Sequence, residues 1–357
     1  MVSHSTQPQS QHDRSSAIQC AVLGASGYSG AELVQLLHHH PHFQPTHLFA
    51  SEQANPQPFN QLFPQYHLGN ELIIEPWQPA GLADLVAQVQ VLFLALPHEA
   101  SAAVISALAE QQLLDQVTVF DLSGAMRLHH AATHQRVYGF AQPDVGYVPY
   151  GLAEYCPLQG SERVIAVPGC YPTVAALALK PLLPLIDRQS VPVINAVSGV
   201  SGAGRKASLN SSFCEVSLHA YGVEGHRHQP EIEQTLGRQV VFVPHLGNFK
   251  RGIVATIYAQ LLPGTAAEDV YAAWQASYHQ QPLIRLRDKP PRQAEIEYTP
   301  FCDLYAQVRD DYAPPQLIVC AAIDNLLKGA AAQALQLANN YHGFSAALGL
   351  LPGARRL

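Results

Sequence analysis

The stretch AVLGASGYSGAEL, residues 21–33, places Gly24, Gly27 and Gly30 between an apolar run and a segment with helical spacing. Glycines at such a junction allow a tight turn and let backbone amides approach a pyrophosphate at the positive end of the following helix. Ser26 stands where the commonest form of this fingerprint has a glycine, and a plain glycine turn would have the same pattern. The position between a strand and a helix favours a dinucleotide-binding turn.

The sequence around this turn alternates between strand-like and helix-like segments. The first apolar run covers residues 18–23, and an alanine-rich helical segment covers residues 100–112. Further buried-strand candidates are found at residues 46–50, 89–96 and 117–122. This alternation predicts an α/β fold with a parallel, doubly wound sheet of the Rossmann type.

The pattern changes after about residue 168. Longer strand-like segments, less regularly separated by helices, are found at residues 191–197, 239–243, 252–262 and 316–322. They predict an α+β second domain with a mixed sheet, and the helix-forming run 326–340 is long enough to return to the first domain. We expect three regions: a disordered tail at 1–16, a dinucleotide-binding domain at 17–168 plus 329–357, and a catalytic and oligomerisation domain at 169–328.

The composition favours small-molecule chemistry. Of the 357 residues, 48% are hydrophobic and 13% are charged, which is typical of a globular chain with a sizeable core. The net charge of -7, without dense Lys or Arg runs, argues against a nucleic-acid partner, and no apolar run reaches the roughly 20 residues of a membrane span. Six cysteines are scattered without CxxC pairs, which indicates reduced thiols in the cytoplasm and no zinc site.

The segment VPGCYPT, residues 167–173, contains a candidate nucleophile. Cys170 follows an apolar strand and a Pro-Gly pair, and Pro172 suits the first turn of the apolar helix that comes next. A thiol at the start of a helix lies in a positive field that stabilises the thiolate. The alternative is a buried structural cysteine. The position at the end of a strand, where ligands bind in α/β proteins, favours a reactive thiol.

A candidate base lies in the loop segment GHRHQPEI, residues 225–232. His226, Arg227 and His228 can together activate a thiol and hold an anion. Alternatively these side chains are solvated, or the His-x-His pair binds a metal. A metal is disfavoured because the sequence offers no clear third ligand.

Two further segments are candidate anion sites. SGVSGAGRKAS, residues 198–208, is a small-residue loop in which Ser201 precedes the cations Arg205 and Lys206, and it is equally compatible with a flexible surface loop. Arg127 follows a strand end, where it either holds a carboxylate or phosphate or lies plainly on the surface. At the end of the second strand, Ser51 and Glu52 do not decide between NAD and NADP.

Seven segments occur in order along the chain: GASGYSG, ALPHEAS, DLSGAMRL, VPGCYPT, SGVSGAGRK, GHRHQPEI and IDNLLKGAAAQA. Over about residues 18–340 the sequence resembles the type 1 N-acetyl-γ-glutamyl-phosphate reductases of arginine biosynthesis. PGCYPT and HRHxPEI are the specific segments, because the glycine turn is shared by many dinucleotide enzymes. The resemblance implies a semialdehyde dehydrogenase-like fold, NADPH as cofactor, N-acetyl-L-glutamyl 5-phosphate as substrate, and a homodimer or homotetramer.

The resemblance also implies roles for the residues that match. Cys170 takes the role of nucleophile and His226 that of acid and base, with His228 as the alternative base or a substrate contact. The implied cofactor contacts are Gly24, Ser26, Gly27, Tyr28, Ser29 and Gly30 at the pyrophosphate, Ser51 at the ribose, and Asn325 and Gly329 near the nicotinamide. Many relatives have a basic residue where this chain has Glu52, and this departure weakens the NADP assignment.

The reaction implied is covalent. Cys170 attacks the acyl phosphate, phosphate leaves toward Arg205 or Lys206, and hydride from NADPH reduces the thioester to N-acetyl-L-glutamate 5-semialdehyde. Three alternatives stay open. One is an aspartate-semialdehyde dehydrogenase, whose nucleophile usually follows Asn rather than Gly169. Another is a reductase of a carrier-bound aminoadipyl phosphate, and the last is a nucleotide sensor without chemistry, which Cys170 and His226 disfavour.

Overall fold

Strand β1, Ile18–Leu23, lies at the centre of a seven-stranded sheet with the order β3-β4-β2-β1-β5-β6-β7. The computed structural model describes residues 17–351, so the tail predicted at 1–16 lies outside the described residues. The strand pairs of this sheet are parallel, except for β3 against β4. The other strands are β2 Phe43–Ala50, β3 Gln57–Pro58, β4 Ile73–Pro76, β5 Val91–Leu94, β6 Thr118–Asp121 and β7 Val164–Ala166.

Two hydrophobic cores cover the two faces of this sheet. Along β1, Cys20 and Val22 pack into one core, whereas Ala21 and Leu23 pack into the other. Because both faces are covered, the central strands are almost continuous apolar runs, and the predicted parallel, doubly wound sheet is confirmed. Its helices are α1 Tyr28–His38, α2 Phe59–Leu62, α3 Leu82–Val86, α4 His98–Glu110 and α5 Ala131–Tyr138.

The second sheet also has seven strands, in the order β12-β13-β14-β11-β8-β10-β9. Strand β8 is parallel to β10 and β12 to β13, while the other pairs are antiparallel, so the predicted mixed sheet is confirmed. The strands are β8 Val193–Ser198, β9 His219–Ala220, β10 Val241–Leu246, β11 Ile253–Gln260, β12 Ile284–Leu286, β13 Cys302–Arg309 and β14 Gln316–Ile323.

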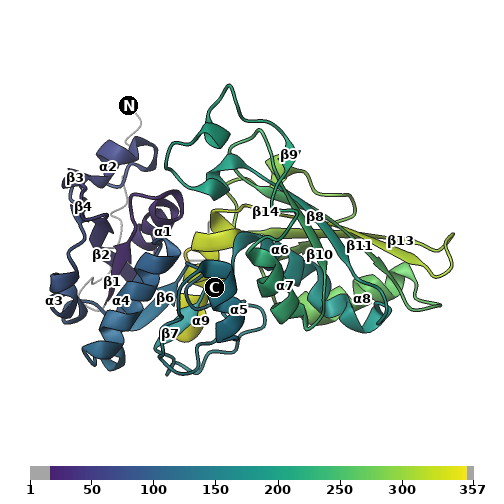
Figure 1. The fold of residues 1–357 in the computed structure, drawn as a ribbon, viewed down its shortest axis with the longest axis horizontal. Helices are drawn as coiled ribbons and strands as arrows, with labels where there is room; N and C mark the ends of the chain where they lie inside the picture. The colour runs from purple at the N-terminus through teal and green to yellow at the C-terminus, as the bar shows by residue number, and fades with distance from the viewer. Residues whose placement is uncertain (1–16, 352–357) are drawn as a thin grey trace, which may run out of the picture.

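Helix α6, Cys170–Leu179, is the central helix of the second half of the chain, and nine of its ten residues are buried. A helix that is apolar on all sides needs cover on all sides. It packs with α7, His228–Leu236, and α8, Ala267–Tyr278, in the core of the second sheet (Figure 1). Its first residue comes shortly after β7, so Cys170 lies where the two halves of the fold meet.

The end of the chain returns to the first sheet. Helix α9, Ala332–Tyr341, joins the core of that sheet and runs beside β6 and β7 (Figure 1). Before it, Leu327–Ala331 form a π-helix, with the N–H of Gly329 donating to the carbonyl of Asp324 at 2.9 Å. The sequence predicts one uninterrupted helix over 326–340. The structure differs, because the first turn of this segment is a π-helix and the α-helix begins only at Ala332. The domain boundaries at 168 and 329 stay a prediction.

A buried ion network ties the two halves of the fold together. Arg251, between β10 and β11, donates from Nη1 to Glu32 of α1 at 2.5 Å, and from Nε and Nη2 to the carboxylate of Asp324 at 2.7 and 3.0 Å. Asp324 also accepts the backbone N–H groups of Leu326 and Leu327. One arginine therefore joins the first helix of the dinucleotide domain to the turn that precedes the π-helix.

Replacing Arg251 by methionine leaves two buried carboxylates without their partner. We expect R251M to lower the free energy of unfolding by about 3–5 kcal/mol, as measured by urea denaturation. Arg292, whose side chain is 77% exposed in its pair with Glu295, is the matched control, and R292M should change the free energy by less than about 1 kcal/mol. Equal effects of the two substitutions would contradict a structural role for the network.

Candidate active site

The glycine turn after β1 has the backbone geometry predicted for it. Gly24 has a φ of +94°, and a Cβ there would lie 2.2 Å from the carbonyl oxygen of Ala95. A Cβ on Gly30 would lie 2.2 Å from the carbonyl oxygen of Gly24. Only glycine fits these two positions. The turn therefore closes tightly over the end of the strand.

The start of α1 fits the pyrophosphate of a dinucleotide. The helix begins at Tyr28 after Gly27, without a side-chain cap and without an acidic residue in its first turn. The first-turn amides of Tyr28, Ser29 and Gly30 can therefore bind an anion. Ser51 follows β2 and is exposed, as is the following glutamate. The fold thus accommodates a nicotinamide dinucleotide along this edge of the sheet.

Cys170 begins α6, with Gly169 as the N-cap, and is partly exposed. The π-helix passes directly against it, because a Cβ on Gly329 would lie 2.7 Å from the Cβ of Cys170 and 3.2 Å from its Cα. Two residues far apart in the sequence, both singled out from their motifs, are thus brought into contact. π-Turns of this kind are often found at functional sites.

Burial raises the pKa of the Cys170 thiol, and Glu231 raises it further. Arg127, the backbone N–H of Tyr171 and Arg227 act in the opposite direction. The net shift is upward, because burial outweighs the stabilisation of the thiolate by the start of the helix. A base must therefore take the proton before the sulfur attacks.

His226 and His228 lie close together beside Tyr171. Their ring centroids are 4.9 Å apart, and they lie 5.9 and 5.8 Å from the ring of Tyr171. Burial, with the neighbouring Arg227, lowers the pKa of His226 to about 4. Burial also lowers the pKa of His228 well below the ordinary value, and the charges of His226 and of nearby arginines add to this shift. Both rings are therefore neutral at pH 7.

The two histidines differ in their hydrogen bonds. The Nδ1 atom of His226 accepts the backbone N–H of His228 at 3.1 Å, so the proton of the neutral ring lies on Nε2. The Nδ1 atom of His228 is buried without a hydrogen-bond partner among the described residues. His228 also borders the loop of the nucleophile, since a Cβ on Gly169 would lie 2.7 Å from its Nε2.

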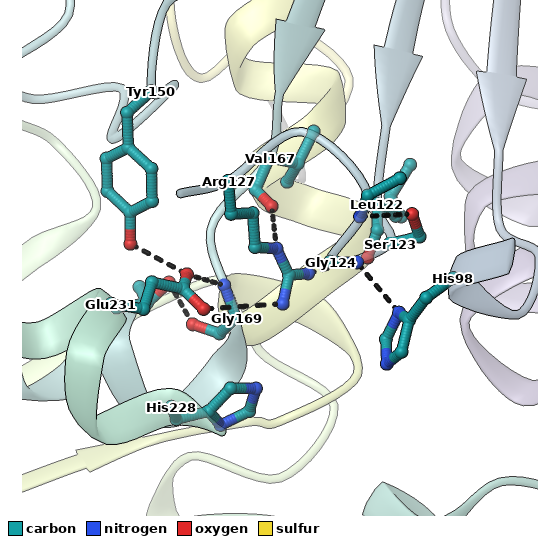
Figure 2. Close-up of polar contacts among 12 residues, drawn as sticks. His98, Leu122, Ser123, Gly124, Arg127, Tyr150, Val167, Gly169, His228 and Glu231 are labelled. Carbon is teal, nitrogen blue, oxygen red and sulfur yellow. Dashed lines mark hydrogen bonds and ion pairs between the residues drawn. The ribbon is translucent and has the colours of Figure 1, made fainter. Parts of the chain in front are cut away.

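Arg127 is part of the protein's own framework, so the alternative of a plain surface arginine is wrong, while the predicted anion contact stays a prediction. Its side chain is buried, with Nε donating to the carbonyl of Val167 at 2.8 Å and Nη2 to that of Leu122 at 2.6 Å (Figure 2). The cation thus binds the ends of β6 and β7 together. Its positive charge still acts on the thiol, as the shift of the Cys170 pKa shows.

The start of the predicted anion loop is held to residues 249–252 by backbone hydrogen bonds. The amide of Asn325 donates to Ser201 Oγ at 3.0 Å and accepts the backbone N–H of Gly252 at 2.6 Å. Its hydrogen bonds therefore hold the loop, and its predicted place near the nicotinamide stays a prediction. Arg205 lies over the ring of Phe63 at 5.4 Å, and it is exposed, as is Lys206.

Sequence reasoning passed over three residues near the nucleophile. His98, the first residue of α4, accepts the backbone N–H of Gly124 at 2.8 Å, and burial together with nearby cations lowers its pKa to about 3. Glu231 and Tyr150 are hydrogen-bonded to each other at 2.8 Å (Figure 2). His98 lies in the segment ALPHEAS and Glu231 in GHRHQPEI, but a motif does not indicate which of its polar residues face the site.

Two family descriptions match the chain. "Semialdehyde dehydrogenase, NAD binding domain" covers residues 19–162, and "Semialdehyde dehydrogenase, dimerisation domain" covers residues 170–325. The N-acetyl-γ-glutamyl-phosphate reductase of Pasteurella multocida is 48% identical over 92% of this chain and 98% of its own length. The N-acetyl-γ-glutamyl-phosphate reductase of Escherichia coli strain K12 is 47% identical over 91% of this chain and 97% of its own length.

The chain belongs to the N-acetyl-γ-glutamyl-phosphate reductase family. The family resemblance inferred from the motifs is thus confirmed. Among solved structures, aspartate semialdehyde dehydrogenase II from Vibrio cholerae, complexed with ASA, has a TM-score of 0.65 and 17% identity over 92% of this chain and 99% of its own. The Candida albicans aspartate semialdehyde dehydrogenase solved with NADP has a TM-score of 0.64 and 16% identity over 92% of this chain and 99% of its own. These likenesses show the shared fold.

The contact between Gly329 and Cys170 in this reductase family member can be tested by adding one methyl group. We expect G329A to push the nucleophile from its position and to lower kcat by about 100-fold, since a displacement near 1 Å can have that effect. Steady-state kinetics measure the loss, and G81A is the control, because a Cβ on Gly81 meets nothing within 4 Å. Unchanged turnover by G329A would show that the π-helix does not position the sulfur.

Proposed function

We propose that this protein reduces N-acetyl-L-glutamyl 5-phosphate to N-acetyl-L-glutamate 5-semialdehyde and phosphate, with NADPH, in arginine biosynthesis. The observation that carries the proposal is the placement of Cys170. It begins a buried helix, contacts Gly329 of the last turn, and lies near two neutral histidines, in a chain of the reductase family.

The proposed reaction begins when His226 takes the proton of the Cys170 thiol on Nδ1, the unprotonated nitrogen of its neutral ring, which must give up the backbone N–H of His228 to do so. The sulfur attacks the acyl carbon, the tetrahedral intermediate expels phosphate, and a thioester remains on the enzyme. When bound, NADPH supplies the hydride that reduces this thioester. His226 returns its proton as the thiohemiacetal collapses and releases the aldehyde. A base of this kind is needed because burial raises the pKa of the thiol.

The phosphate is proposed to bind near Ser201, Arg205 and Lys206, as the sequence predicts. Arg227 is an additional candidate, because it is exposed and its charge acts on Cys170 and on both histidines. Arg127 is proposed as a further anion contact through Nη1, because only its Nε and Nη2 donate to main-chain carbonyls.

The proposed cofactor contacts are Gly24, Ser26, Gly27, Tyr28, Ser29 and Gly30 at the pyrophosphate, Ser51 at the ribose, and Asn325 and Gly329 near the nicotinamide. The family match and the glycine turn support them. NADPH is proposed from the family. An exposed Glu52 can point away from a 2′-phosphate, so its presence is compatible with this choice.

The protein is proposed to act as a homodimer or homotetramer in the cytoplasm. The match to the dimerisation domain supports association, and the second sheet has an open face on which Val241 and Tyr258 are 47% and 43% exposed. All six cysteines are free, as in a reducing compartment. None of the helices between residues 17 and 351 has the length and apolar character needed to span a bilayer.

The covalent step can be tested at the sulfur. We expect C170A to abolish reduction of the acyl phosphate, because the proposed thioester cannot form without this sulfur, while NADPH binding measured by fluorescence stays within about twofold of wild type. Retained turnover by C170A would overturn the thioester mechanism.

The substrate can be tested separately with the wild-type enzyme, by offering it aspartyl phosphate and a carrier-bound aminoadipyl phosphate, the substrates of the two related reductases.

The base can be identified by its pH dependence. Because the pKa of His226 is lowered to about 4, the ring stays neutral as the pH falls from 7 to 5, and kcat/KM should begin to fall only toward pH 4. We expect H226Q to lower kcat/KM by about 100-fold or more and to remove this acid limb. H228Q is the comparison, and a larger loss in H228Q, with the acid limb intact in H226Q, would move the base to His228.

A further inference from the structure

A buried carboxylate holds the loop that carries the nucleophile. Glu231 of α7 is fully buried, and its Oε1 accepts two hydrogen bonds at 2.8 Å, one from the backbone N–H of Gly169 and one from the hydroxyl of Tyr150 (Figure 2). Gly169 is the N-cap of α6 and directly precedes Cys170. The carboxylate therefore holds the residue from which the nucleophile projects.

Arg127 supports the same loop from the other side. Its Nη1 lies 3.6 Å from Glu231 Oε2, while Nε and Nη2 bind the carbonyls of Val167 and Leu122 (Figure 2). Both charges are buried, with side-chain exposures of 7% for the arginine and 0% for the glutamate. The pair thus connects α7 to the ends of β6 and β7, immediately before the nucleophile.

The space around Gly169 leaves little freedom for the loop to move. A Cβ on Gly169 would lie 2.7 Å from His228 Nε2 and 2.9 Å from Arg127 Nη1. His228 and Glu231 are three residues apart on α7, so they lie on one face of that helix. Helix α7 therefore brings His228 against the loop, and the hydrogen bond from Gly169 to Glu231 fixes the distance between this helix and the loop.

We propose that Glu231, supported by Arg127 and Tyr150, is a positioning residue that holds Cys170 in register with the histidines of the loop before α7 and of its first turn. The proposal rests on the proposed function for the identity of the nucleophile. Glu231 does not touch the substrate in this proposal. It acts through its hydrogen bond to Gly169, so its loss affects turnover more than substrate binding.

The charge of Glu231 has a second, separable effect. It raises the pKa of Cys170, whereas Arg127 and Arg227 lower it. The other titratable groups close to the sulfur or to this pair are Asp121, Tyr171, Tyr221, His226, His228, His98, Tyr138 and Tyr150. Removal of the carboxylate charge leaves the arginines uncompensated, so the thiol should ionise at lower pH. Position and charge can therefore be measured separately.

The experiment compares two substitutions of Glu231. E231A removes the hydrogen bonds and the charge, while E231Q removes the charge and keeps an oxygen that can accept from Gly169. We expect kcat to fall about 100-fold in E231A and less than tenfold in E231Q, with KM within about threefold in both. The pH profile of Cys170 alkylation by iodoacetamide, followed by peptide mass spectrometry in the full-length protein without substrate, should shift to lower pH by a similar amount in both.

Two further variants control the comparison. Y150F removes one hydrogen bond to Glu231 without changing its charge, so kcat should fall severalfold while the alkylation profile stays in place. E233Q alters another glutamate on the same helix, which is hydrogen-bonded to Gln229, and should leave both measurements unchanged. If E231A does not fold by circular dichroism, Y150F decides the result, and a wild-type kcat in Y150F overturns the proposal.

Two outcomes contradict the proposal directly. Wild-type kcat in E231A would show that the loop needs no anchor, and equal loss of kcat in E231A and E231Q would show that charge, not position, is what matters. The alkylation readout does not depend on the acyl phosphate. If the wild-type enzyme failed to reduce N-acetyl-L-glutamyl 5-phosphate, while E231A and E231Q still shifted the alkylation profile, the proposed function would fail and the placement of Glu231 beside the thiol would stand.

Discussion

The close approach of the last turn to the nucleophile is the constraint on which the rest of the site depends. Gly329 lies so near Cys170 that a single added carbon would collide with its Cβ at 2.7 Å. The π-helix that carries Gly329 is held at its start by Asp324, which is bound by Arg251 together with Glu32 of the dinucleotide domain. The position of the sulfur relative to the dinucleotide-binding edge is thus set by contacts between the two halves of the fold.

Two buried arginines near the site are paired with carboxylates, and each joins segments that are distant in sequence. Arg251 joins α1 to the turn before the π-helix, and Arg127 joins two strand ends to α7. A buried charge without its partner is strongly destabilising, so these pairs fix one arrangement of the segments that they connect. The same burial keeps the histidines neutral and raises the pKa of the thiol, which makes proton transfer from the sulfur part of the proposed reaction.

Much of the fold could be predicted because its signals are local. The apolar runs of β1 and β5, the glycines after β1 and the Pro-Gly-Cys junction follow from strand and turn chemistry within a few residues. Strand β4, Ile73–Pro76, and strand β13, Cys302–Arg309, were missed, since short or mixed polar and apolar strands have weak patterns. For Arg127 and Asn325 the sequence gives no sign that their donors bind main-chain and side-chain groups far away along the chain.

The sequence by itself determined the family, the two kinds of sheet, and the candidate nucleophile and histidines, because motifs and periodicity are properties of neighbouring residues. The tertiary structure alone decided that Gly329 lies against Cys170, that Glu231 holds Gly169, and that the thiol has a raised pKa. These features depend on burial and on contacts between distant segments. Hydrogen-bond partners and the loss of solvent around a charged group arise only when the chain has folded.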